Sequence, residues 1–228
     1  MLKNIVDKRT QAIVLKRTNY GEADRILNLI TPDGKVSAMA RGVRKTKSKL
    51  AGGVEMLALV EVNLHFGRGE LATVTGAKGL QYYRNILKDY NRMELAALML
   101  KKINMVAEGT ESAEYFELLR EGLDGLDVGL NLALVESWFL LNLLKVTGEE
   151  VNLYRDVEGK RLEASMSYDY NVSESSFQES SGGAFGANEI KMLRLMTTMR
   201  LAFAARVKGA DEILPGILRL TRIVSKMM

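Results

Sequence analysis

Near Gly79 the hydrophobic pattern of the chain changes from the period of strands to that of helices, and this change limits the possible folds more than any other feature. Before it, short apolar runs alternate with polar residues and are separated by turn residues, which is typical of β-strands. After it, apolar residues recur at the spacing of one helix face. The sequence therefore predicts an α+β protein in which a β domain, residues 1–80, precedes a helical domain, residues 81–228.

Five strands are predicted in the first domain, at residues 11–15, 25–30, 35–41, 56–66 and 71–75. A strong turn signal, Thr31-Pro32-Asp33-Gly34, separates the second from the third, because Pro and Asp stand early and Gly last. Five short strands suggest a small β-barrel of the OB type, with an SH3-like barrel as the nearest alternative.

Three helices are predicted after the barrel, at residues 93–106, 115–126 and 132–146. The third is apolar on nearly all sides, so we expect it to be buried. Its Trp138 is expected to be a core anchor rather than a platform for a nucleic-acid base, because large aromatic side chains dominate core burial.

The helical pattern is interrupted at about residues 149–187, which are polar and rich in serine. We expect an irregular insertion with weak strands here. A helix is then predicted to restart with Asn188 as its N-cap, and a last helix is predicted to begin near Pro215 and Gly216.

Charge is spread unevenly along the chain. Residues 1–50 carry twelve Lys/Arg against four Asp/Glu, residues 51–187 carry twelve against twenty-one, and residues 188–228 carry eight against three. Residues 34–54 hold six cations and no carboxylate. A cluster of one sign on a rigid scaffold attracts a polyanion, and basic ends around an acidic middle suggest a nucleic-acid surface built from both termini.

Nine cations on or beside the first three predicted strands are candidates for binding that polyanion. They are Lys16, Arg17, Arg25, Lys35, Arg41, Arg44, Lys45, Lys47 and Lys49. Tyr20 is the only aromatic residue in the first fifty, so we expect contacts to the nucleic-acid backbone with little reading of bases. A solubilising charged loop is the alternative, and composition alone does not distinguish DNA from RNA.

The sequence offers little for catalysis or for metal binding. The chain has no cysteine, which excludes disulfides, thiolate metal sites and cysteine nucleophiles. Its one histidine, His65, lies in a predicted strand without an apparent catalytic partner, so a structural role is expected. Four acidic residues at helical spacing are expected to form a solvated helix face rather than a metal site: Glu111, Glu114, Glu117 and Glu121. We expect no catalytic residue, no metal and no cofactor.

No signal-peptide pattern is visible at the N-terminus. The longest apolar stretch, residues 138–144, is interrupted by Asn142 and is far shorter than the ~20 residues that span a bilayer. We therefore expect a cytoplasmic protein without a membrane partner.

An ordered series of motifs runs through the N-terminal part of the sequence: AIVLK (residues 12–16), YGEADRIL (20–27), LITP (29–32), GK (34–35), ARGVRK (40–45) and KSKL (47–50). With these motifs the sequence resembles the RecO family of bacterial recombination mediators. The resemblance implies an OB fold that binds single- and double-stranded DNA and anneals complementary strands. It also implies help in loading recombinase onto DNA coated by single-stranded-DNA-binding protein, in gap repair by the RecF pathway.

Partners also follow from the resemblance. They would be RecR and the acidic C-terminal tail of the single-stranded-DNA-binding protein, with RecF as a further candidate, at the nucleoid. The resemblance implies neither catalysis nor a nucleotide cofactor. Many RecO proteins carry a four-cysteine zinc module in the helical domain, whereas residues 151–181 here contain no cysteine. The insertion would then be a zinc-free counterpart of a zinc ribbon, and we expect it to be looser.

A second set of cations near the C-terminus has three interpretations. The set comprises Arg194, Arg200, Arg206, Arg219, Arg222 and Lys226. These residues would extend the DNA track, receive the acidic tail, or form a solvated helix face. For the whole chain, an RNA-binding OB-barrel protein of translation or RNA metabolism is the alternative. A nuclease would need a carboxylate or histidine cluster that the sequence does not reveal, and a pure scaffold would lack affinity for polyanions.

Overall fold

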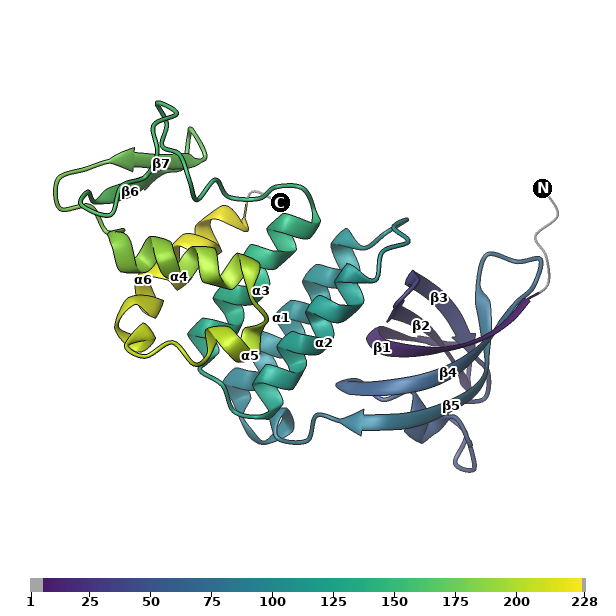
Figure 1. Ribbon diagram of the computed structural model, residues 1–228. Coiled ribbons are helices and arrows are strands. Elements are labelled where there is room, and N and C mark those ends of the chain that lie inside the picture. Colours follow the sequence, from purple (N-terminus) through teal and green to yellow (C-terminus); the bar gives the residue numbers. More distant parts are fainter. Residues whose placement is uncertain (1–5, 227–228) are drawn as a thin grey trace. The chain divides into compact units, whose positions relative to one another are not determined.

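The computed structural model describes residues 6–226 (Figure 1). It confirms the α+β class, with a five-stranded barrel first and helices after it. Contacts divide the chain into two compact units, Met1–Asp127 and Val128–Met228, so the first unit holds two helices as well as the barrel. The predicted boundary after residue 80 falls inside the last barrel strand, which ends at Tyr82, and it remains a prediction about domains.

The barrel strands are β1 (Val6–Tyr20), β2 (Asp24–Thr31), β3 (Gly34–Ala40), β4 (Ala58–Phe66) and β5 (Ala72–Tyr82). They close in the order β1-β2-β3-β5-β4, and β3 pairs with β5 in parallel. The first strand closes the barrel because its first half, to Ile13, pairs with β4 and its second half pairs with β2. The predicted OB barrel is therefore confirmed, rather than the SH3-like alternative.

Alternating residues of all five strands fill the barrel core. Val14, Leu27, Ala38, Val62 and Val74 are examples, and each is buried. The alternation located every strand but underestimated the lengths of β1 and β5. Their exposed ends are held by ladder hydrogen bonds rather than by burial, so hydrophobic pattern alone does not mark them.

The first unit continues with a short 3-10 turn, η2 (Ile86–Lys88), and two helices, α1 (Tyr90–Val106) and α2 (Glu114–Asp127). The Asp89 side chain caps α1 by accepting from the Arg92 amide at 3.1 Å. The predicted apolar face of α2 is buried, including Phe116 and Leu123. Another 3-10 turn, η1 (Ala51–Gly53), precedes β4.

The second unit contains α3 (Leu132–Val146), α4 (Ala187–Thr198), α5 (Leu201–Ala204) and α6 (Ala210–Val224). The α3 helix is central to this unit, because it packs against both α4 and α6. Trp138 of α3 is 4% exposed, and its indole Nε1 donates to the Met199 carbonyl at 3.0 Å. The prediction of Trp138 as a core anchor is confirmed.

Two predicted helix starts were wrong. The N-cap of α4 is Gly186, not Asn188, and its amide donates to the Glu189 carboxylate at 2.9 Å. The α6 helix begins at Ala210 after Gly209, whose φ of 75° ends the preceding turn. Pro215 therefore lies inside α6, near its start, where a missing amide removes a single ladder bond.

The insertion folds around a two-stranded sheet, β6 (Tyr168–Asn171) and β7 (Ser176–Glu179). Phe177 is buried and meets the rings of Tyr170 and Phe185 edge-to-face, with centroids 5.4 and 5.5 Å away. The predicted irregular insertion with weak strands is confirmed, and its small core is aromatic.

None of the helices in the described part of the chain combines the length and the apolar character needed to cross a bilayer.

Candidate nucleic-acid interface

Strand register brings three connections to one end of the barrel. Arg25 near the start of β2 lies opposite Ala40 at the end of β3, and Met39 of β3 lies opposite Thr73 near the start of β5. The β1–β2 turn, the segment after β3 and the β4–β5 loop therefore lie at the same end. We call residues 20–25, 41–49 and 67–71 the barrel rim. In OB folds the loops that join β1 to β2 and β4 to β5 help to bind oligonucleotides.

We call residues 34–54 the basic segment. Its first part after β3 folds back onto the β1–β2 turn. The Gly42 amide donates to the Asp24 carboxylate at 2.7 Å, and the Arg44 amide donates to the Ala23 carbonyl at 2.9 Å. The Arg44 guanidinium also donates to the Gly21 carbonyl at 3.2 Å, and Val43 is buried beneath. These contacts give the cations of this part a defined position.

The second part of the segment consists of turns that end on the barrel wall. The Ser48 amide donates to the Lys45 carbonyl at 2.9 Å, and the Tyr82 hydroxyl donates to the Gly52 carbonyl at 2.9 Å. Gly53 lies so close to β5 that a Cβ there would be 2.5 Å from the Ala77 carbonyl carbon. Only glycine fits this approach, so Gly53 secures the far end of the segment.

Five predicted cations of the segment are exposed: Arg41, Arg44, Lys45, Lys47 and Lys49. Within residues 6–226, none of the five pairs with a carboxylate. Exposed carboxylates at the rim are Glu22 and Glu70. The rim thus presents a row of cations whose charge is available to phosphate groups.

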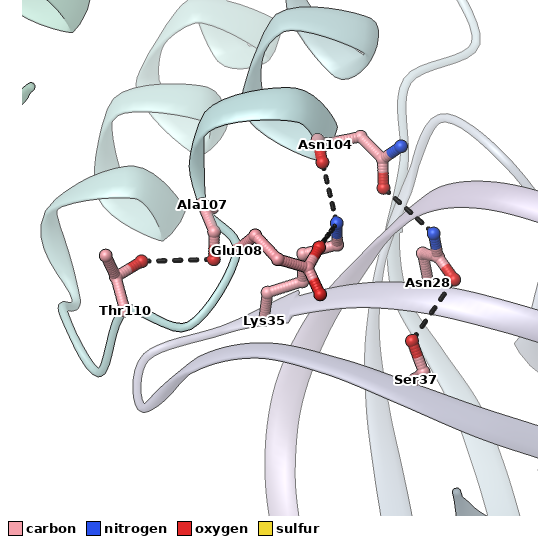
Figure 2. Close-up of polar contacts among 7 residues, drawn as sticks. All are labelled: Asn28, Lys35, Ser37, Asn104, Ala107, Glu108 and Thr110. Atoms are coloured by element: carbon pink, nitrogen blue, oxygen red, sulfur yellow. Dashed lines mark hydrogen bonds and ion pairs between the residues drawn. The ribbon is translucent and has the colours of Figure 1, made fainter.

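Lys35 has a different environment from the other cations of the segment (Figure 2). Its side chain is 8% exposed, and its Nζ donates to the Asn104 carbonyl at 2.6 Å and pairs with the Glu108 carboxylate. The neighbouring Asn28 amide donates to the Asn104 side chain at 3.0 Å. Lys35 joins β3 to the end of α1, so we leave it out of the proposed surface.

The remaining barrel candidates differ in availability. Arg17 pairs with Glu55 at 2.7 Å and is partly buried, whereas Lys16 is exposed. The Arg25 Nε donates to the Asn19 side chain at 3.2 Å, at the rim. Arg17 is therefore the least available of these three.

Two further rim residues complete the candidate interface. Tyr20 ends β1 and is 56% exposed, so it is the aromatic residue of the rim that a base could meet. Arg68 in the β4–β5 loop is exposed and was missed as a candidate. Arg68 stands between two glycines, Gly67 and Gly69, in a loop that only strand register brings to the rim.

The residues with catalytic potential do not converge. His65 Nδ1 lies 2.7 Å from the Asp7 carboxylate, a pair on neighbouring strands. Glu117 of the acidic helix face pairs with Arg120 at 2.5 Å. No group of three or more metal-binding side chains occurs among the described residues.

The six C-terminal cations occupy several environments. Arg222 binds the Glu136 carboxylate through two bonds, at 2.6 and 2.7 Å, and so joins α6 to α3. Arg194 lies over the Tyr154 ring at 4.7 Å, and Arg206 lies over the Phe203 ring at 5.3 Å. Arg200, Arg219 and Lys226 are exposed. Arg222 therefore has a structural role, and the other five cations do not gather in one cluster but lie on or beside different helices.

Two family models match the chain. "Recombination protein O N terminal" matches residues 5–83, and "Recombination protein O C terminal" matches residues 87–223. The first match covers the barrel, and the second covers nearly all that follows.

Curated relatives bear the same family name. A DNA repair protein RecO of Dehalococcoides mccartyi is 32% identical over 227 residues, which cover 91% of this chain and 85% of that protein. A DNA repair protein RecO of Rubrobacter xylanophilus is 35% identical over 142 residues, covering 61% of this chain and 57% of the relative. One of Heliobacterium modesticaldum is 37% identical over 141 residues, covering 61% and 51%.

Proposed function

Because the chain belongs to the RecO family, we propose that it acts in DNA repair and recombination as a DNA-binding mediator, without catalysis of its own. The observation that carries the proposal is the barrel rim. Five exposed cations without a carboxylate partner among the described residues lie at the ligand-binding end of an OB barrel. Such a rim suits a DNA backbone.

The rim would bind phosphates rather than bases. Arg41, Arg44, Lys45, Lys47 and Lys49 would each neutralise a phosphate, while Tyr20 is the aromatic side chain available there for stacking. Contacts to phosphates carry no sequence information, so single- and double-stranded DNA of any sequence would bind. If about five phosphates of a single strand are engaged, log affinity should fall with log salt at a slope of roughly −3.5.

Strand annealing would follow from this charge. Two complementary strands repel one another through their phosphates, and neutralisation of both lowers that barrier. Binding with little sequence preference suits the task, since any pair of complementary strands has to be brought together. Assistance in loading recombinase onto coated single strands would use the same DNA contacts.

The second unit offers a surface for a protein partner. Met199, Phe203 and Val207 are exposed apolar residues around α5, and Arg200 and Arg206 stand between them. Apolar residues beside cations suit an acidic peptide with apolar side chains. The acidic tail of the single-stranded-DNA-binding protein is the proposed occupant, and RecR and RecF are further proposed partners.

An annealing assay tests the proposal. Complementary oligonucleotides coated with the single-stranded-DNA-binding protein would be mixed with the chain, with and without RecR. We expect faster annealing with the wild type than with a rim variant that combines Arg41→Ala, Arg44→Ala, Lys47→Ala and Lys49→Ala. A matched control would remove four exposed lysines elsewhere: Lys88→Ala, Lys101→Ala, Lys191→Ala and Lys208→Ala. Equal annealing by the wild type and the rim variant would contradict the proposal, as would a preference for structured RNA over DNA.

A further inference from the structure

A cavity of about 420 Å3 opens between the insertion and α4 in the second unit. Its lining residues are Tyr154, Arg155, Arg161, Leu162 and Arg194. Three of the five are arginines, and none is acidic. We call this cavity the arginine pocket.

A tight turn holds two of the arginines opposite one another. Arg155 and Arg161 form an antiparallel bridge across it. The buried Asp156 carboxylate accepts from the Glu158 amide at 3.0 Å and from the Lys160 amide at 2.9 Å. Asp156 thus shapes the turn through its backbone contacts, and within residues 6–226 it forms no ion pair with either arginine.

The placement of these two arginines is electrostatically unfavourable. Like charges directly opposite one another on paired strands are destabilising. The Arg155 guanidinium donates to the Gly159 carbonyl at 2.7 Å, which satisfies a donor but leaves the charge. Throughout residues 6–226, neither Arg155 nor Arg161 pairs with a carboxylate. An anion bound between them would relieve the repulsion.

The third arginine comes from α4 and is fixed on two sides. Arg194 Nε donates to the Leu153 carbonyl at 2.9 Å, and its guanidinium lies 4.7 Å from the centroid of the Tyr154 ring. A guanidinium held in this way loses little conformational freedom when it binds a ligand. Arg194 thus presents a preorganised charge at the pocket, on a different element from the other two.

We propose that the arginine pocket binds the terminal phosphate of a nucleotide. A phosphomonoester carries close to two negative charges and three acceptor oxygens, which suits three guanidinium groups better than a single carboxylate does. The volume lies within the usual range for small-ligand sites, and Tyr154 and Leu162 supply a wall for the sugar and base. Free nucleotides and 5′-phosphorylated strand ends share this chemistry. Only the second source rests on the proposed DNA binding.

Binding measurements on the full chain distinguish these sources. In the first arm, deoxyadenosine monophosphate and deoxyadenosine would be titrated by calorimetry. In the second arm, one oligonucleotide would be compared with and without a 5′-phosphate. We expect the phosphorylated member of the first pair to bind about tenfold tighter or more, since each charge-assisted bond contributes on that scale. A difference in the second pair identifies the strand end as a source.

Substitutions locate the effect. Arg155→Ala with Arg161→Ala should abolish the preference for phosphate, and relief of their repulsion keeps the turn folded. The control Lys191→Ala with Lys208→Ala removes two exposed charges elsewhere and should keep the preference. The rim variant should weaken binding of the oligonucleotide with and without the 5′-phosphate, while leaving nucleotide binding intact. The DNA-binding proposal for the rim and the phosphate proposal for the pocket can therefore fail independently. Equal binding of nucleotide and nucleoside would overturn the proposal. The proposal would also be overturned if inorganic phosphate failed to displace the bound nucleotide while an acidic peptide bound at these arginines.

Discussion

The cations of the barrel rim lie separately along the segment that follows β3 and in the neighbouring loops. The arginine pocket instead gathers three arginines around one cavity, two from a turn of the insertion and one from α4. A row of separate charges matches the repeating phosphates of a strand, and its contribution is spread over many weak contacts. A converging group matches one compact, highly charged anion and depends on a fixed geometry. The same residue types therefore lead to different expectations about salt, stability and specificity.

A third environment shows what a purely structural cation looks like. Lys35 and Arg222 are each engaged by a carboxylate from a distant part of the sequence, Glu108 and Glu136. Neither the rim cations nor the pocket arginines have such a partner among the described residues. Pairing, rather than residue type, separates the structural cations from those proposed to bind ligands.

The largest effect is expected from removing the support of the pocket. Phe177 is buried between two aromatic rings, and its carbonyl accepts from the Val157 amide at 2.8 Å, beside the arginine turn. Phe177→Ala should destabilise the insertion by about 3–5 kcal/mol, because it removes a ring from a small core. Limited proteolysis should then cut residues 149–187 much faster, while DNA binding at the rim persists.

An exposed substitution in the same insertion, Val172→Ala, provides the control and should leave the cleavage rate unchanged. The wild-type insertion is itself expected to be cut before the helices, as its small core and lack of thiolate ligands suggest. Cleavage of Phe177→Ala at the wild-type rate would show that the aromatic cluster does not hold the segment together.

The rim variant should have the next largest effect. Loss of four phosphate contacts should flatten the salt slope by about 2.8 and lower single-strand affinity roughly 100-fold or more at low salt. Fluorescence anisotropy over a range of salt concentrations measures both quantities. The four-lysine control should keep nearly the wild-type slope; if it flattens equally, net charge rather than the rim governs binding.

Removing a paired cation should affect stability instead of DNA binding. Arg222→Ala leaves Glu136, whose side chain is 8% exposed, without this arginine, and should cost about 1–2 kcal/mol after allowance for the exposure of Arg222. Lys35→Ala should cost about 1 kcal/mol, since Glu108 remains hydrated. Thermal unfolding measures the losses. A flattened salt slope in Lys35→Ala would return that residue to the interface.

The smallest effect concerns acid. The backbone amide of Ala184 donates to Asp169 and, with help from the Ser180 hydroxyl, holds the pKa of Asp169 below its ordinary value of 3.8. The carboxylate therefore stabilises the insertion above that ordinary value, and the contribution is lost as pH falls through the lower folded pKa. An NMR titration should show the lowered pKa of Asp169, and Asp169→Asn should remove the dependence of the insertion's stability on pH in this range. A pKa at or above the ordinary value would refute this account.

Much of the fold was predictable because hydrophobic period reflects burial. Alternation identified the barrel strands, and the buried face of α2 was visible as helical spacing. The starts of α4 and α6 were mispredicted because a glycine cap and an internal proline depend on local geometry. The exposed ends of β1 and β5 were missed because strand pairing without burial leaves no alternating hydrophobic pattern.

The candidate sites were predictable only in part. The basic segment was visible as a run of one sign, but the rim also includes Arg68, which strand register brings there. The arginine pocket was not predicted, since Arg155 and Arg161 stand in a polar insertion far from Arg194 in sequence. A bridge across a turn and a helix packed beside it assemble that pocket.

The sequence by itself determined the order of the β domain and the helices, the absence of thiolate chemistry and the sign of the proposed DNA surface. These properties follow from the period of burial and from residue identity, which are local. Only the tertiary structure decided which cations are neutralised, because the partners lie far apart: Lys35 and Glu108 are separated by 73 positions, and Arg222 and Glu136 by 86. Electrostatic interaction depends on distance in space, so the same charged residue is structural in one place and available to a ligand in another.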